Sequence, residues 1–274
     1  MATQPDANLR KLDIELPASP PATLRLAGLL AKEDVSVAEV AEVIEGDLAL
    51  AAAVVRTVNS AMFGVLRRVE TVAEAVVFLG MREVSGITLE LGLRTRFPPS
   101  PAMTRLWDAA RLRGLLMGRT AASLDLHAWR AQSAGLFAQS GQAVLCLHAP
   151  QAYPALLAAH AAPGADPAAL LAAESAAYGL SHEVLGASLC RAWGLAGDVA
   201  DFVRERPHGL ARWAQRPQPV RALLALGAVA DALIGGGDAE AEAARVGPDS
   251  GLAPQPLLQA ARQHWQRIAD AAAG

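Results

Sequence analysis

The pattern that most constrains the fold is a repeated signal for the start of a helix. Residues 36–39 read Ser-Val-Ala-Glu and residues 71–74 read Thr-Val-Ala-Glu. Both match the capping box, in which the first side chain and the fourth side chain each satisfy a free backbone amide of the first turn. Apolar residues then recur at i, i+3, i+4 and i+7 from Val37, and no segment alternates with the period of a strand between hairpin turns. The sequence therefore predicts an all-α fold.

Stop and start signals define further helices and a boundary. Asp47 is a predicted N-cap, and Gly80 is expected to end one helix before another begins. The proline-rich segment 97–101 cannot continue a helix, because proline lacks the backbone N–H. We expect an N-terminal helical lobe over 10–97, a second helical lobe over 101–210, and C-terminal helices packed on the second lobe over 211–274. Helices are predicted over 48–58, 72–79, 81–93, 101–124, 128–147 and 220–234. Three further helices are predicted: one that starts at residue 167, one that ends at Gly194 and one that follows Pro254. Residues 238–253 are expected to form a loop that is at best partly helical.

Composition narrows the function classes. The chain has 274 residues and a formal net charge of −3, which argues against a dedicated nucleic-acid binder, since such proteins present a basic face. The N-terminus has no apolar run suited to a signal peptide, and the longest apolar stretch, 222–236, is too short to span a membrane. We expect a cytoplasmic protein without a membrane partner.

A group of arginines allows two interpretations. Arginines gather between residues 204 and 221, and they are either an anion-binding patch or the solvated face of a helix. The members are Arg204, Arg206, Arg212, Arg216 and Arg221.

Local motifs for chemistry are absent from the sequence. No two of the six histidines lie within one helical turn of each other, neither cysteine belongs to a Cys-x-x-Cys pair, and no GxSxG, phosphate-loop or GxGxxG motif occurs. Cys146 and Cys190 lie in apolar stretches and are expected to be buried and reduced. The sequence predicts no catalytic residue, no bound metal and no cofactor.

One segment carries a family resemblance. Residues 46–64 read GDLALAAAVVRTVNSAMFG, and Leu79-Gly80 follow at the expected place. These residues resemble the HDOD domain, and the similarity continues more weakly through Trp107, residues 134–137 and residues 178–187, covering about 10–205 in order. The resemblance implies a two-lobed helical fold related to the HD-domain phosphohydrolases.

The signature segment has a structural and a functional interpretation. Asp47 starts a helix whose residues Leu50, Val54 and Val58 face inward, and Asn59 and Ser60 end it by competing for backbone hydrogen bonds. In the functional interpretation, a partner or signal contacts a surface formed by Arg56, Asn59, Ser60 and Phe63.

The resemblance also shows which metal ligands are missing. Ala109 stands where the first histidine is expected, and Ala138-Gln139 stands where the family's enzymes have a His-Asp pair. Asp231 matches the last aspartate, but one carboxylate does not hold a catalytic divalent metal. We expect Asp231 to cap or hydrogen-bond a neighbouring helix, and His182 to be a core residue at a helix N-terminus. Were a metal nevertheless present, a displaced site would use His182, Asp231 and His208.

The resemblance implies a non-catalytic bacterial signal-transduction module that acts through protein–protein interaction, with another signalling protein as its partner. Two alternatives stay open. One is a sensor that binds cyclic di-GMP without cleaving it, and the other is a residual metal-dependent phosphohydrolase.

Overall fold

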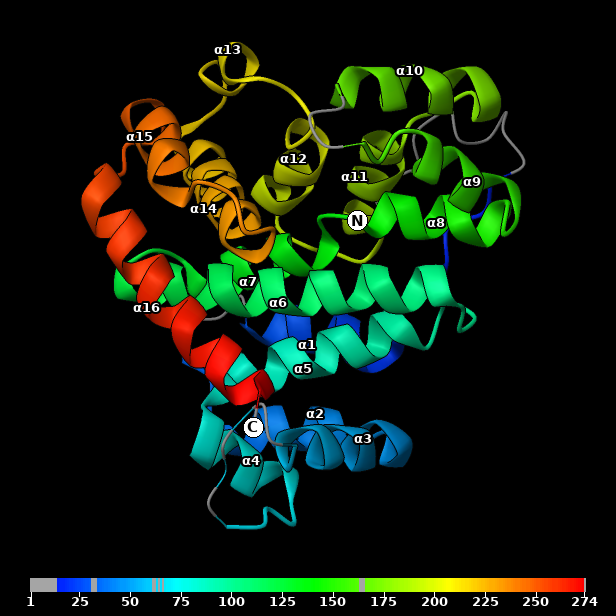
Figure 1. Ribbon diagram of the computed structural model, residues 1–274. Coiled ribbons are helices and arrows are strands. Elements are labelled where there is room, and N and C mark those ends of the chain that lie inside the picture. Colours follow the sequence, from blue (N-terminus) through cyan, green and yellow to red (C-terminus); the bar gives the residue numbers. More distant parts are fainter. Residues whose placement is uncertain are drawn as a thin grey trace.

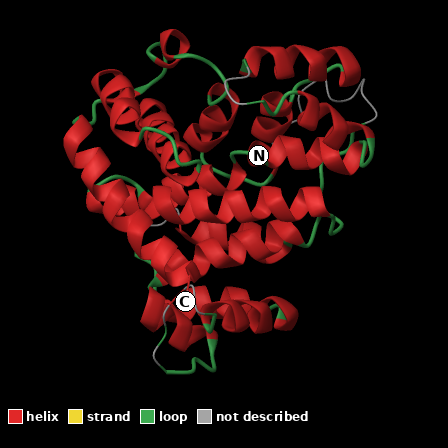
Figure 2. Cartoon of the chain, viewed as in Figure 1, coloured by secondary structure: helices red, strands yellow, loops and turns green. Residues whose placement is uncertain are grey.

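The structure is a computed structural model that describes residues 14–30, 34–60, 63, 65, 67–162 and 166–273. These residues form helices and connecting loops, with no strand among them (Figure 2), so the all-α prediction is confirmed. In chain order the helices are α1 (Pro21–Leu30), α2 (Val37–Glu45), α3 (Leu48–Val58), α4 (Val72–Leu79), α5 (Met81–Arg94), α6 (Pro101–Ser123), α7 (Ala128–Phe137), α8 (Ser140–His148), α9 (Ala152–Ala159), α10 (Pro167–Tyr178), α11 (His182–Ala192), α12 (Gly197–Glu205), α13 (Leu210–Trp213), α14 (Gln218–Ile234), α15 (Ala239–Ser250) and α16 (Pro254–Ala273).

The helix starts that the sequence predicts form the N-terminal lobe. Ser36 and Glu39 complete a capping box at the start of α2, and the Asp47 side chain accepts a hydrogen bond from the amide of Leu50 at the start of α3. The second box is only half formed. Thr71 caps the amide of Glu74, but the Glu74 carboxylate accepts from the amide of Glu70 instead.

Two apolar cores meet along α5. Buried side chains from α2, α3 and α4 form the smaller core together with Val84 and Ile87 on α5. Farther along the same helix, Leu89 and Leu93 join the larger core, which is built around α6. Figure 1 shows α6 across the middle of the molecule, with α2–α4 below α5 and with α8–α11 and α14–α16 above or beside α6. The helix α5 therefore contributes buried side chains to both cores.

Small residues let α6 and α7 approach closely. A Cβ built on Gly135 would lie 2.7 Å from backbone atoms of Gly114, so a larger residue at position 135 would push the two helices apart. This approach brings the end of α7 and the following Gln139 beside α6, where the candidate site forms.

Two predictions of local structure are wrong. The helix predicted over 128–147 is interrupted at Ala138 and Gln139, where α7 ends and α8 begins. No proline or cap explains this break. It coincides with tertiary contacts, since Gln139 bonds to Arg113 and a Cβ on Gly141 would meet the carbonyl oxygen of His182 at 1.8 Å.

The second error is the loop predicted over 238–253. Residues 239–250 form α15, because Asp238 caps its first turn and Ala239, Ala243 and Val246 bury one face at helical spacing. The helix continues through Gly247 and Pro248, although neither residue type favours a helix interior. No sequence pattern described above predicts α1, α9, α12 or α13. None of the described helices is long and apolar enough to cross a membrane.

Candidate functional site

A buried guanidinium lies where the resemblance places the metal site of the HD enzymes. Arg113 on α6 is only 5% exposed, and its Nε donates to Asp231 Oδ1 on α14 at 2.6 Å. Its Nη1 donates to Gln139 Oε1 at 3.2 Å. Arg113 therefore joins Gln139, at the position expected for the His-Asp pair, to Asp231, at the position of the last aspartate.

A second arginine completes the charge pairing of Asp231. Arg206, which follows α12, donates to Asp231 Oδ2 from Nη2 at 2.7 Å and from Nε at 3.2 Å. Burial by itself would raise the pKa of Asp231, but Arg206 and Arg113 outweigh it and hold that pKa below its ordinary value. Both carboxylate oxygens of Asp231 thus accept charge-assisted hydrogen bonds.

The surroundings of Arg113 also shift its own pKa. Burial lowers the pKa of its guanidinium, while the charge of Asp231 opposes that change. Because arginine keeps its proton in proteins, the group between Gln139 and Asp231 is a fixed cation that can donate but not accept hydrogen bonds.

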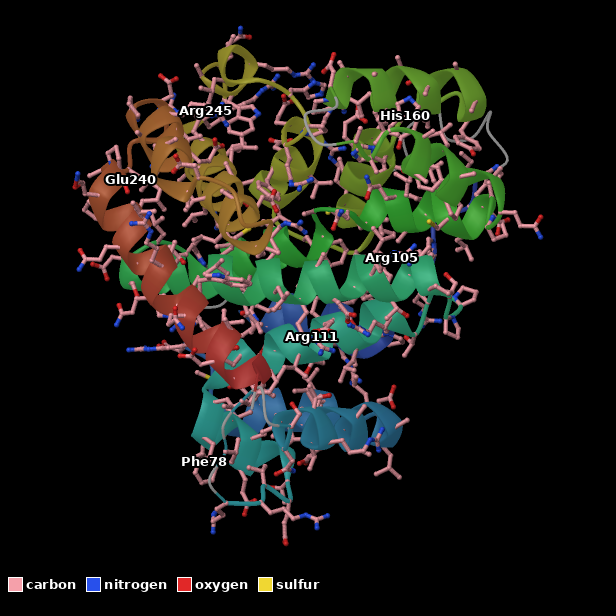
Figure 3. All side chains as sticks on the ribbon, in the orientation of Figure 1. Phe78, Arg105, Arg111, His160, Glu240 and Arg245 are labelled. Atoms are coloured by element: carbon pink, nitrogen blue, oxygen red, sulfur yellow. The ribbon has the colours of Figure 1, made fainter. Side chains whose placement is uncertain are left out.

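A cavity of about 920 Å³ opens beside this cluster. His182, His208 and Asp231, which the sequence analysis named for a displaced metal site, all line it. Trp213, Arg245 and His160 line it as well; Figure 3 labels Arg245 on α15 and His160 directly after α9. His182, His208 and Asp231 therefore line one cavity, although both carboxylate oxygens of Asp231 already accept hydrogen bonds from arginines.

His208 has an unsatisfied atom in this cavity. Its Nε2 is buried and has no hydrogen-bond partner among the residues that the structure describes. Burial lowers the pKa of His208, and the charge of Arg212 lowers it further. A neutral imidazole is the consequence near neutral pH.

His182 is held by a carboxylate on α10. It begins α11, as the sequence predicted, and is 7% exposed. Glu174 accepts hydrogen bonds from the His182 amide at 2.8 Å and from the hydroxyl of Tyr153 at 2.6 Å, and it lies 2.7 Å from His182 Nδ1. Burial would raise the pKa of Glu174, but its hydrogen bond with His182 and that residue's charge lower it. Glu174, although it lies on α10, thus caps the first turn of α11.

Among the described residues, Glu174, His182 and Glu183 are the one group of three whose ligand atoms lie close enough for a metal ion, within 4.8 Å of one another. Glu174 fits a metal poorly, because its oxygens already face three donors. The cysteines offer no nucleophile. Both are free and buried, and burial raises the pKa of Cys146 to about 11 and raises that of Cys190 as well.

The predicted partner surface lies at the end of α3. Asn59 has a structural role there, because its side chain donates to the carbonyl oxygens of Val55 at 2.9 Å and Val69 at 2.8 Å and accepts from the amide of Val69 at 2.9 Å. Arg56 and Ser60 are exposed, and Phe63 is half-buried against both cores. Residues 61, 62 and 64 of the signature segment lie outside the described residues. The partner role of the surface stays a prediction.

The arginines predicted as an anion patch are mostly paired. Arg206 binds Asp231, while Arg212 and Arg216 both pair with Glu205, which is 2% exposed. Arg221 donates to two backbone carbonyls. Only Arg204 makes no hydrogen bond or ion pair with a described residue.

Sequence reasoning missed Arg113. One signal could have found it, since Arg113 lies four residues after Ala109 and so faces the same side of its helix.

The fold agrees with several solved structures. A Shewanella amazonensis SB2B protein that is named as a phosphohydrolase is 23% identical to this chain. The TM-score is 0.73, and 98% of each chain is covered. A Marinobacter aquaeolei VT8 protein assigned to signal transduction is 21% identical, with a TM-score of 0.75 over 95% of this chain and 59% of its own. An HDOD domain protein of Geobacter sulfurreducens is 22% identical, with a TM-score of 0.67 over 97% of this chain and 91% of its own.

Sequence comparison gives the family. An uncharacterized protein of Treponema pallidum is 25% identical over 193 residues, which are 69% of this chain, and the chain spans 37% of that relative's length. The family model of the HDOD domain matches residues 16–208. This match includes α1–α12, the two lobes and the Arg113 position, and the chain belongs to the HDOD family.

Proposed function

We propose that this chain is a regulatory module that acts by binding a partner and does not catalyse metal-dependent phosphohydrolysis. The observation that carries the proposal is the position of the Arg113 guanidinium between Gln139 and Asp231. HDOD membership and the relative assigned to signal transduction support the regulatory role.

The chemistry of the cluster opposes a catalytic metal. A hydrolytic metal site needs several protein ligands and an open position for water. Here Ala138 has no donor atom, Asp231 is neutralised by two arginines, and Arg113 brings a positive charge to the place of the cation. A divalent ion would have to displace a guanidinium that is itself buried.

The exposed surface of the N-terminal lobe supports a protein partner. Val77 and Phe78 on α4 are 73% and 49% exposed, and the guanidinium of Arg67 lies 5.4 Å from the centre of the Phe78 ring. Figure 3 shows Phe78 at the outer edge of this lobe. Exposed aromatic and arginine side chains are enriched at protein interfaces. We infer that another signalling protein contacts this lobe.

The charges of the cavity beside Asp231 disfavour a cyclic dinucleotide. Its lining includes three carboxylates (Asp166, Asp231, Glu242) and two guanidiniums (Arg206, Arg245). Both guanidiniums are already paired, with Asp231 and Glu242 respectively. Little positive charge is left there for two phosphates.

Two measurements test the proposed function. Purified protein should not hydrolyse bis(p-nitrophenyl) phosphate or cyclic di-GMP with added manganese, and turnover that a chelator abolishes would contradict the absence of catalysis. For the binding role, a partner captured by the wild-type chain should be lost with Phe78→Ser and kept with Arg105→Ser, a control on α6 (Figure 3). Equal capture by both variants would contradict a role for the α4 surface.

A further inference from the structure

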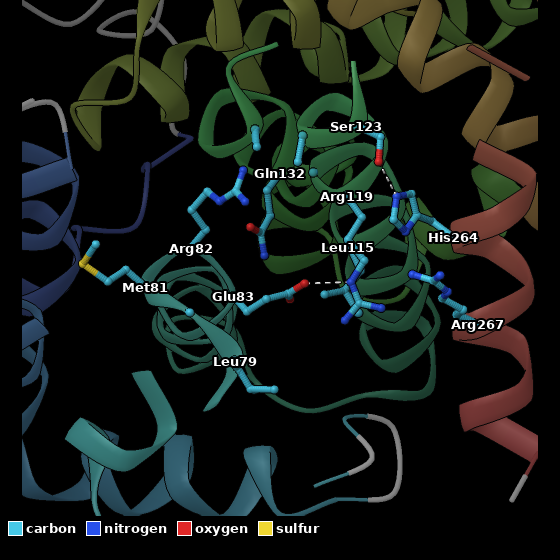
Figure 4. A pocket seen from close by; sticks show the side chains of 14 residues that line it. Leu79, Met81, Arg82, Glu83, Leu115, Arg119, Ser123, Gln132, His264 and Arg267 are labelled. Carbon is cyan, nitrogen blue, oxygen red and sulfur yellow. Dashed lines mark hydrogen bonds and ion pairs between the residues drawn. The ribbon is translucent and has the colours of Figure 1, made fainter. Parts of the chain in front are cut away.

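A second cavity, of about 510 Å³, lies between the two lobes and shares no lining residue with the cavity around Asp231. Its walls come from the first turn of α5, from α6, from the start of α7 and from α16 (Figure 4). The volume is in the range of small-molecule sites, which is about 300–1,000 Å³. The α16 wall lies beyond the residues that match the HDOD family.

The charge of this cavity is positive. Its lining has three guanidiniums, on Arg82, Arg119 and Arg267, and one carboxylate, on Glu83. Arg119 Nε donates to Glu83 Oε1 at 2.7 Å, so that pair is neutral overall. Arg82 and Arg267 make no hydrogen bond or ion pair with any described residue. Two unpaired positive charges therefore remain at one cavity, in contrast to the paired arginines beside Asp231.

An amide side chain that makes no hydrogen bond with a described residue also faces this cavity. Gln132 on α7 is 6% exposed, lines the cavity, and its side chain makes no hydrogen bond with a described residue. Gly86 on α5 makes room for it, since a Cβ there would lie 1.8 Å from Gln132 Nε2. No atom of this amide is among the fully enclosed polar atoms without a partner, so the amide opens to the cavity and can form a hydrogen bond with a polar ligand there.

Neutral donors complete the lining. His264 Nε2 lies 2.8 Å from the hydroxyl of Ser123, and both face the cavity in Figure 4. Burial lowers the pKa of His264, and the charges of Arg119 and Arg267 lower it further. The first turn of α5 is also open, because its N-cap is Gly80, which has no side chain to satisfy the free amides.

We propose that this cavity binds a small molecule through a phosphate group. A phosphate offers several acceptor oxygens and a double negative charge, which match Arg82, Arg267, the Gln132 amide and the open first turn of α5. The ligand joins α5 to α16, so its binding ties the N-terminal lobe to the C-terminal helix. The site uses none of the residues on which the proposed partner binding rests, so either proposal can fail without the other.

Calorimetric titration of the full chain with inorganic phosphate and with adenosine monophosphate, in phosphate-free buffer of low ionic strength, tests the proposal. Wild-type protein should bind at least one probe. The double variant Arg82→Ala/Arg267→Ala should bind it at least about tenfold more weakly, since two charge-assisted contacts are lost. Arg262→Ala is the matched control on α16, because Arg262 pairs with Glu240 outside this cavity.

The two probes distinguish the source of the phosphate. Equal affinity indicates a free phosphate site, and tighter binding of the nucleotide indicates contacts to the organic part. An NMR titration gives a second readout, in which the bound anion should raise the pKa of His264. Absence of binding by either probe up to about 10 mM, or unchanged affinity in the double variant, would overturn the proposal.

Discussion

Arg113 Nε and Asp231 Oδ1 lie 2.6 Å apart although the two residues are 118 positions apart in the sequence. The contact joins the central helix α6 to α14 and directs a buried positive charge at the one carboxylate that matches an HD metal ligand. Arg206, directly after α12, donates to the other oxygen of the same carboxylate. The arginine–aspartate cluster is thus both a tie between helices and the physical basis for proposing that this family member carries no metal.

Removing the central guanidinium should destabilise the fold. Arg113→Ala leaves Gln139 without its donor and Asp231 with one arginine instead of two. Breaking a buried pair costs about 3–5 kcal/mol, but Asp231 is 32% exposed, so we expect about 1–3 kcal/mol after solvent screening. Urea denaturation measures the loss. The control is Arg105→Ala, an exposed arginine on the same helix, and an equal effect of both variants would contradict the prediction.

The charge of Asp231 should make stability depend on pH. Its pKa is lower in the folded state than the unfolded value of about 3.9. The carboxylate therefore contributes stability that is fully present above about pH 4 and is lost as the pH falls through the folded pKa. The difference in unfolding free energy between wild type and Asp231→Asn should be constant from pH 7 to 5 and should shrink in acid. A difference that grows in acid would show the opposite shift.

Substitutions at the end of α3 should distinguish Asn59, which has a structural role, from Arg56, which lies on the surface. Asn59→Ala leaves the backbone N–H and C=O of Val69 without their side-chain partner, which should cost about 1–3 kcal/mol. Arg56→Ala should leave the melting temperature unchanged, because Arg56 is exposed and makes no contact of this kind with a described residue. Loss of partner capture in Arg56→Ala would then report the surface alone. A melting temperature that falls equally in both variants would contradict this division.

Restoring the missing pair should not restore metal binding. In Ala138→His/Gln139→Asp, Arg113 still occupies the site and Ala109 still replaces the first histidine. A new aspartate at position 139 is expected to pair with Arg113 instead of a metal, since Gln139 already lies 3.2 Å from it. Calorimetry with manganese should detect no stoichiometric binding. Tight binding by the double variant would show that the remaining residues can still form a metal site.

The sequence predicts the local structure where caps and apolar spacing decide it. The starts of α2, α3 and α10 depend on Ser36, Asp47 and Asp166, and each forms as expected. Prediction from the sequence fails where tertiary contacts decide where a helix ends or continues. Nothing local ends α7 at Ala138, and α15 contains Gly247 and Pro248 yet stays helical because one face of this helix, which includes Gly247, is buried.

The candidate site was predicted in part. The resemblance placed Ala138, Gln139 and Asp231 at the former metal site, and the structure brings Gln139 and Asp231 to one arginine. That arginine could not be assigned from the sequence, because pairing between residues 118 positions apart depends on how α6 and α14 pack. For the same reason, the meeting of Arg82, Gln132 and Arg267 at one cavity has no local signal in the sequence.

Elemental analysis of the purified wild-type chain tests the central claim most directly. The protein would be incubated with zinc, iron or manganese, passed through a desalting column, and analysed for metal by mass spectrometry. With Arg113 bound between Gln139 and Asp231, the account predicts far less than about 0.1 metal per chain, since too few ligands remain. A value near one metal per chain, lost together with Asp231→Asn, would contradict it.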